Sequence, residues 1–182
     1  SYSTPNSAVV FAADNVWMQY MHWNGAQWTK NDAGFESFRK VSDTIAYAMQ
    51  TNGTLYRYDG EGWTLVTLPA GVTARANSRV FNVTPDEKLL LQTQDNSFVV
   101  LSRDSSGAYT TDRTVPAIPT DVLGDVWTTD SVATYAAIRP DSITIVDGTI
   151  SSDGSIYMVV NGSSSSRAYI VRYDKNAWTL LD

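Results

Sequence analysis

Apolar and polar residues alternate with a period of two along most of this chain, and that alternation is typical of half-buried β-strands. Clear examples are TLYRY at residues 54–58 and RAYIVRY at residues 167–173. Each run ends in a short turn rich in Asp, Asn or Gly, and a second run that opens with Trp-Thr follows. The pattern predicts a series of β-hairpins.

The turn of these hairpins is repeated. The three clearest copies are WNGAQWT at residues 23–29, YDGEGWT at residues 58–64 and YDKNAWT at residues 173–179. Weaker copies surround Asp104 and Asp147, and the five turns follow one another at intervals of 27 to 45 residues. Further alternating runs precede the copies, for example at residues 44–49 and 155–160, so each repeat unit holds at least three strands.

Irregular repeats near forty residues with four short strands are typical of β-propeller blades, because each twisted sheet buries both faces only against its neighbours. We therefore predict one all-β domain over residues 1–182, a small β-propeller of five short blades. The short last interval leaves four blades as the alternative. Innermost strands are predicted at residues 79–83 and 122–127, and a fourth unit at residues 132–148 with its turn at Asp147-Gly148.

The first unit is predicted to begin with its second strand, at residues 8–12. A blade that lacks an innermost strand would leave a thin seam in the ring. Residues 1–7 are therefore predicted to lie against the first unit and to close that seam.

The Tyr-Asp-Gly…Trp hairpins resemble the blade ends of small β-propeller repeat proteins of the tectonin, tachylectin and kelch-like type. Residues 102–110 are also similar to the Asp-box of sialidase propellers, S-x-D-x-G-x-x-W-T, although Gly107 comes one place late and Tyr109 replaces the tryptophan. The resemblance spans nearly the whole chain and implies a propeller architecture.

One segment is open to a helical interpretation. Phe35, Phe38, Val41, Ile45 and Met49 recur at helical spacing, which predicts an amphipathic helix over residues 35–49. Against this, residues 45–49 align with strands of the other units, and no Ser or Thr cap stands just before the segment.

Composition narrows the function classes. A hydrophobic share of 43% with 18% charged residues is typical of a folded protein. A net charge of −6 argues against nucleic-acid binding, which needs clustered positive charge, and no apolar run approaches the roughly 20 residues of a membrane span. The absence of cysteine excludes disulfides and Cys-based metal sites. The many aromatic, Ser and Thr residues favour an extracellular or virion-surface location.

Catalytic residues are hard to find. His22 is the only histidine, and it takes the repeat position of Arg57 and Arg172, which predicts a surface-facing polar residue. Most aspartates fall in predicted turns, where they cap their own backbone. A glycoside hydrolase, which needs two carboxylates facing each other across a pocket, stays as an alternative. We predict a non-enzyme without cofactor or metal.

Aromatic side chains are the candidate ligand-binding groups, because flat rings stack on the C–H faces of sugars. Trp28, Trp63 and Trp178 open the outermost strands and are predicted to cover the gaps between blades. A repeated ligand site and a repeated packing site predict the same pattern, so both interpretations remain. The candidate ligand-binding residues are Trp17, Tyr20, Trp23, Tyr56, Tyr58 and Tyr173.

Two non-catalytic functions fit this pattern. The first is a recognition module that binds glycans or a cell surface for a virion or secreted protein. The second is a structural assembly domain of a phage capsid, neck or tail, whose partners are proteins. A homo-oligomer is compatible with both.

Overall fold

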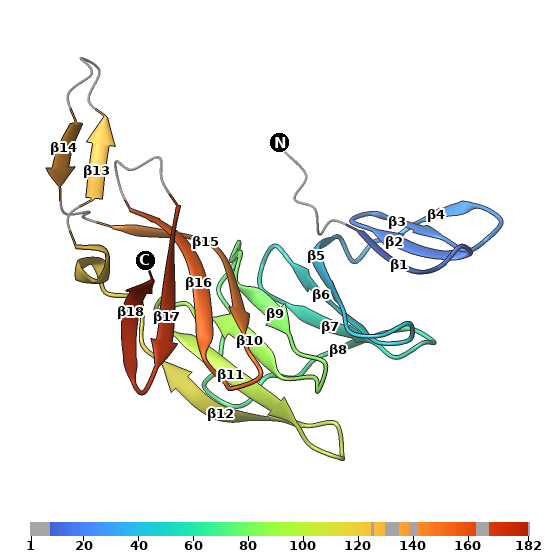
Figure 1. The fold of residues 1–182 in the computed structure, drawn as a ribbon. Helices are drawn as coiled ribbons and strands as arrows, with labels where there is room; N and C mark the ends of the chain where they lie inside the picture. Colours follow the sequence, from blue (N-terminus) through green and yellow to red (C-terminus); the bar gives the residue numbers. More distant parts are fainter. Residues whose placement is uncertain (1–7, 125, 130–134, 139–141, 163–167, 182) are drawn as a thin grey trace.

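The computed structural model describes residues 8–124, 126–129, 135–138, 142–162 and 168–181. In this part of the chain the regular structure consists of eighteen strands and one short 3-10 helix, η1 (Thr120–Leu123). The strands form four four-stranded antiparallel sheets and one two-stranded hairpin (Figure 1). The prediction of an all-β, propeller-like fold is confirmed.

Each four-stranded sheet is a simple meander in which successive strands pair with their neighbours. The first sheet contains β1 (Ala8–Ala12), β2 (Asn15–Met18), β3 (Met21–Trp23) and β4 (Trp28–Lys30). The second contains β5 (Phe35–Lys40), β6 (Ala46–Gln50), β7 (Leu55–Tyr58) and β8 (Trp63–Leu65).

The third sheet contains β9 (Phe81–Val83), β10 (Leu89–Gln92), β11 (Phe98–Arg103) and β12 (Tyr109–Val115). The fourth contains β15 (Ile143–Ile150), β16 (Ile156–Gly162), β17 (Ala168–Asp174) and β18 (Ala177–Leu181). Between them lies the hairpin of β13 (Val126–Thr129) and β14 (Tyr135–Ile138).

The four sheets follow one another in an arc. Their first strands are in contact in order, β1 with β5, β5 with β9 and β9 with β15, as the innermost strands of propeller blades are. In Figure 1 the first sheet and the fourth sheet lie at opposite ends of the molecule. The described residues therefore form an open arc of blades, with an uncovered sheet at each end.

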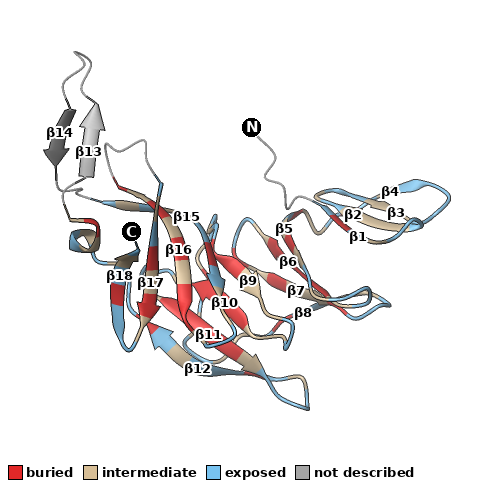
Figure 2. Cartoon of the chain, viewed as in Figure 1, coloured by how far each residue is buried: buried red, intermediate tan, exposed pale blue. Residues whose placement is uncertain are grey.

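Three apolar clusters hold the arc together, and each joins two adjacent sheets. The first and second sheets share Val9, Phe38 and Tyr58, the second and third share Tyr47, Leu55 and Leu101, and the third and fourth share Phe98, Met158 and Trp178, among others. Figure 2 shows buried residues concentrated in the second, third and fourth sheets, while the first sheet is mostly half-buried or exposed. Among the described residues no helix is long and apolar enough to cross a membrane.

Among the described residues there are four four-stranded sheets, the number of the four-blade alternative and not of the five-blade prediction. The predicted turn at Asp147-Gly148 is wrong. The strand β15 runs through this dipeptide, with a bulge between Ile145 and Asp147. Gly148 serves packing, because a Cβ there would lie 2.3 Å from the Met158 sulfur. The glycine that suggested a turn instead lets the next strand approach closely.

Two other boundaries also differ from the predictions. Residues 122–127 are not one inner strand, since η1 ends at Leu123 and β13 begins at Val126. The inner strand predicted at residues 79–83 is present as the shorter β9, which begins at Phe81. Residues 8–12 are the innermost strand of the first sheet and not its second strand. The predicted packing of residues 1–7 lies outside the described residues.

The helix considered for residues 35–49 is replaced by β5 and β6. A bulge between Phe35 and Ser37 inserts one residue into β5. Phe35 and Phe38 are therefore buried in the same cluster although they stand three residues apart. The bulge imitates helical spacing within a strand.

Candidate functional site

The two faces of each sheet carry different residues of the repeat. We call one the tryptophan face, because it bears the Trp of the Trp-Thr pair and the aromatic residue opposite it, and the other the threonine face, because it bears the Thr. The aromatic pairs on the tryptophan faces are Trp23–Trp28, Tyr58–Trp63 and Tyr173–Trp178, and Tyr109 holds the tryptophan position in the third sheet.

The threonine face has its own repeated row. An aromatic residue on the second strand stands beside a basic residue or His on the third strand and Thr on the fourth. The rows are Trp17–His22–Thr29 in the first sheet, Tyr47–Arg57–Thr64 in the second and Tyr157–Arg172–Thr179 in the fourth.

Within the arc, the tryptophan face of each sheet packs on the threonine face of the sheet before it. Trp63 meets Trp17 edge to face, with ring centroids 5.8 Å apart. In the next contact the hydroxyls of Tyr109 and Tyr47 lie 2.5 Å apart. Trp178 packs against Phe98 of the third sheet at 5.8 Å. The repeated motif thus encodes one kind of sheet-to-sheet contact.

The Thr of each Trp-Thr pair ties the outermost strand to its neighbour. Its Oγ1 donates a hydrogen bond to the carbonyl of the residue opposite, from Thr29 to His22 and from Thr64 to Arg57 at 3.2 Å, and from Thr179 to Arg172 at 3.4 Å. This recurring bond explains why Thr follows Trp in all three clear copies.

Turn aspartates act on their own backbone. Asp59 accepts from the backbone N–H groups of Glu61 and Gly62, and these hydrogen bonds lower its pKa. The hydroxyl and backbone of nearby serines lower the pKa of Asp153 to about 2. The interpretation of these carboxylates as turn caps is supported by their contacts. Among the described residues no group of three or more His, Asp or Glu side chains is placed to hold a metal ion.

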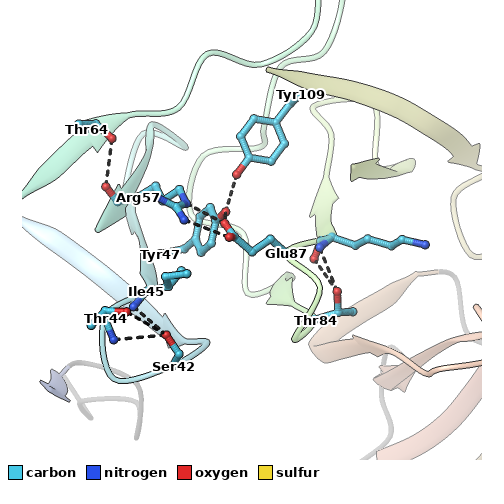
Figure 3. Close-up of polar contacts among 10 residues, drawn as sticks. Ser42, Thr44, Ile45, Tyr47, Arg57, Thr64, Thr84, Glu87 and Tyr109 are labelled. Atoms are coloured by element: carbon cyan, nitrogen blue, oxygen red, sulfur yellow. Dashed lines mark hydrogen bonds and ion pairs between the residues drawn. The ribbon is translucent and has the colours of Figure 1, made fainter. Parts of the chain in front are cut away.

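The contact between the second and third sheets contains a polar cluster (Figure 3). Arg57 donates two hydrogen bonds to Glu87, at 2.7 and 3.0 Å, and the Tyr47 hydroxyl donates to the same carboxylate. Tyr47 is fully buried, and the Arg57 and Glu87 side chains are only 14% and 17% exposed. The hydrogen bonds from Arg57 lower the pKa of Glu87, and burial raises the pKa of Tyr47.

This cluster bears on the repeat position of His22, which is predicted to be surface-facing, and adds a residue that the sequence did not reveal. Arg57 holds the same position and is not surface-facing, because it lies between two sheets and binds Glu87. Glu87 stands in the turn before β10 with φ of 60°, a left-handed conformation that is unusual for glutamate. Both carboxylate oxygens are engaged, so Glu87 links the third sheet to the second.

The candidate ligand-binding aromatics range from buried to exposed. Tyr58 is buried and stacks on Phe11 at 4.4 Å, and Tyr56 packs in the same contact of the first two sheets. Trp17 stacks on His22 at 3.8 Å, and burial lowers the pKa of that imidazole.

The remaining candidates lie elsewhere. Tyr173 is buried between the third and fourth sheets beside Trp178. Tyr20 is exposed in the turn after β2, and Trp23 is half-buried on the tryptophan face of the first sheet, where it pairs with Trp28 at 5.6 Å. The structure therefore does not bring the six candidates together in one pocket.

Three surface clefts have volumes of about 590, 470 and 500 Å³. The largest lies where the third and fourth sheets meet and includes Arg75, Arg79 and Asn96. None of the six candidate aromatics lines these clefts. The sequence does not mark either arginine as a site residue, since Arg75 lies outside the repeated strands and Arg79 only opens a predicted inner strand.

Two sheet faces have no neighbouring sheet within the described residues: the tryptophan face of the first sheet and the threonine face of the fourth. On the first sheet this face exposes four large apolar side chains, Val10, Met18, Met21 and Trp28. Trp28 is 47% exposed, whereas Trp178 at the same repeat position is 9% exposed. On the fourth sheet the uncovered face exposes Ile170 and Leu181. These uncovered faces are the candidate interaction site.

Comparison with known proteins supports the fold. No family model and no curated protein matches the chain. Among solved structures, the N-terminal domain of Nup159 is similar with a TM-score of 0.56 and 13% identity over 94% of this chain and 46% of that one. A second similar structure, YCF48 bound to D1 peptide, has a TM-score of 0.44 and 15% identity over 88% of this chain and 46% of that one.

Both of these structures are β-propellers. The similarity to the Nup159 domain supports a β-propeller fold. The chain spans about half the length of the structures it matches. At these identities the likeness concerns the fold alone.

Proposed function

We propose that this chain is a non-catalytic recognition and assembly module that binds protein through the uncovered tryptophan face of its first sheet. One observation carries the proposal: this face bears the same motif that binds a neighbouring sheet elsewhere in the chain, yet Trp28 is 47% exposed. Contiguous exposed apolar surface on a folded protein commonly marks an interaction site.

Binding energy at such a face comes from a few large side chains. Trp is among the residues that dominate protein interfaces when a partner covers it. Trp28 and Trp23 form an aromatic pair on the sheet, and Met18 and Met21 surround it with flexible apolar surface. The acidic chain with many Ser and Thr residues is consistent with a virion or secreted surface protein, as the sequence predicts.

Glycan or cell-surface attachment is a second candidate function. It is favoured by the exposed ring of Trp28, which offers a flat apolar surface to a sugar. The cleft beside Arg75 and Arg79 offers a separate polar site for an acidic sugar. Of the two candidates, protein assembly accounts for the recurrence of the motif in the packed contacts as well.

Photo-cross-linking separates the two functions. A benzophenone amino acid at Met21, on the proposed face, is expected to cross-link the purified chain to another protein molecule. The same group at Leu65, an exposed residue of the second sheet, is not expected to form such a cross-link. A glycan array and a panel of chromogenic glycosides complete the test. A glycan hit lost in Trp28→Ala, without a cross-link from position 21, would favour attachment, and glycoside turnover abolished by one Asp→Asn change would make the protein an enzyme.

A further inference from the structure

The two uncovered faces are complementary halves of the contact that the chain makes three times internally. In each internal contact a tryptophan face covers a threonine face. Within the described residues, no neighbouring sheet covers the tryptophan face of the first sheet or the threonine face of the fourth. One end of the arc therefore presents a tryptophan face, and the other end presents a threonine face of the kind that such a face covers.

The uncovered threonine face repeats the features of the covered ones. In the second sheet, Tyr47 receives Tyr109 of the next sheet, and Arg57 stands beside Tyr47 on the same face. In the fourth sheet, Tyr157 and Arg172 hold the same two positions, and the Arg172 guanidinium lies 5.8 Å from the Tyr157 ring. The next row of this face is apolar, with Val159, Ile170 and Leu181 side by side across the strands.

We propose that two copies of this chain associate head to tail and close one ring of eight sheets, in which the tryptophan face of each first sheet covers the threonine face of the other copy's fourth sheet. The inference rests on the proposed function, because it names the partner of the same face. Trp28 of one copy would lie over Tyr157 of the other, as Trp63 lies over Trp17 within the chain.

The size of the arc favours two copies. The described arc holds four four-stranded sheets, so two arcs supply eight. A ring of eight sheets falls within the range known for propellers, which have four to eight blades in typical cases. Two copies related by a twofold axis form two identical contacts, and a ring closes without further subunits.

Charge variants test the pairing of the two faces. Trp28→Glu changes the uncovered face of the first sheet, and Tyr157→Glu changes the uncovered face of the fourth. Leu65→Glu is the control, because Leu65 is exposed but belongs to the second sheet and lies on neither uncovered face. Sedimentation analysis is expected to show a dimer of the wild-type chain, dissociation constants raised roughly 30-fold or more by each of the first two changes, and no effect of the control.

Mixing the two disruptive variants gives the sharpest outcome. In an equimolar mixture, one of the two contacts in a mixed dimer joins two unchanged faces, so partial dimerisation should return. Each alternative geometry gives a different result. A dimer sensitive to Trp28→Glu alone would show that two first sheets pair with each other, and it would overturn ring closure while leaving the proposed function intact.

Several other results would also overturn the ring. These are a wild-type chain that stays monomeric, an assembly of more than two copies, a mixture that regains no dimer, or a control as disruptive as Trp28→Glu. Where a variant fails to fold by circular dichroism, Met18→Glu replaces the first change and Ile170→Glu the second, since these exposed residues lie on the same faces.

Discussion

Trp28 and Trp178 occupy the same position of the repeat but lie in opposite surroundings. Trp178 is buried against Phe98 and Tyr173, and its indole N–H donates to the Pro116 carbonyl at 2.9 Å. Trp28 lies on a sheet face that no neighbouring sheet covers among the described residues. The tryptophan of the repeat thus contributes to stability only where an adjacent sheet covers it. Where no sheet covers it, its ring is available for binding.

The largest expected effect on stability comes from replacing the buried tryptophan of this pair. Trp178→Ala should lower the free energy of unfolding by about 3–5 kcal/mol, because it removes a buried aromatic side chain and leaves a cavity. Trp28→Ala in the dilute chain should cost less than about 1 kcal/mol, because its ring is half exposed. Urea denaturation measures both values. Equal losses for the two variants would contradict the difference in their surroundings.

The polar cluster is the next test of a covered contact. Glu87→Gln keeps the shape of the side chain but leaves Arg57 charged and partly desolvated, so unfolding free energy should fall by about 3 kcal/mol. Glu61→Gln, in the exposed turn after β7, is the matched control and should be nearly neutral. A neutral result for Glu87→Gln would show that the ion pair does not stabilise the contact.

Acid pH should reproduce part of the same effect. The pKa of Glu87 is lower in the folded chain than its ordinary value of 4.5, so its contribution is present above about pH 4.5. That contribution is lost as pH falls through the folded pKa. The stability difference between wild type and Glu87→Gln should therefore shrink below pH 4.5. A difference that stays constant down to acid unfolding would contradict the assignment.

The smallest expected effect concerns the repeated Thr. Thr64→Val removes one exposed hydrogen bond to the Arg57 carbonyl and should cost about 1 kcal/mol. Thr29→Val and Thr179→Val should cost similar amounts, since the same bond recurs in the first and fourth sheets. Thermal denaturation of the three variants measures this. A loss confined to Thr64 would show that the bond matters only beside the polar cluster.

Much of the fold could be predicted from the sequence because its determinants are local. Alternating residues and Asp, Asn and Gly turns define most strands of the four sheets. The blade count was harder, since Asp147-Gly148 has the composition of a turn while Gly148 provides space for Met158. The bulge in β5 similarly imitates a helix. Both errors arise where a glycine or an extra residue serves packing between strands.

The candidate site could be predicted only in part. The repeat identified the aromatic positions, but whether a given ring is covered depends on whether another sheet lies beside it. Glu87 and Arg57 are 30 positions apart and meet only when two sheets pack, so no local pattern reveals their bond. The exposure of Trp28 likewise follows from the open arc and not from its own sequence.

Hydroxyl-radical footprinting of the tryptophans tests the central claim most directly, because it reports which repeat positions are covered. In the dilute chain Trp28 should be oxidised readily and Trp178 should be protected. At concentrations where the chain associates, Trp28 should become protected while Trp178 stays unchanged. Trp28 that is as protected as Trp178 in the dilute chain, or that stays reactive in the associated state, would contradict the account.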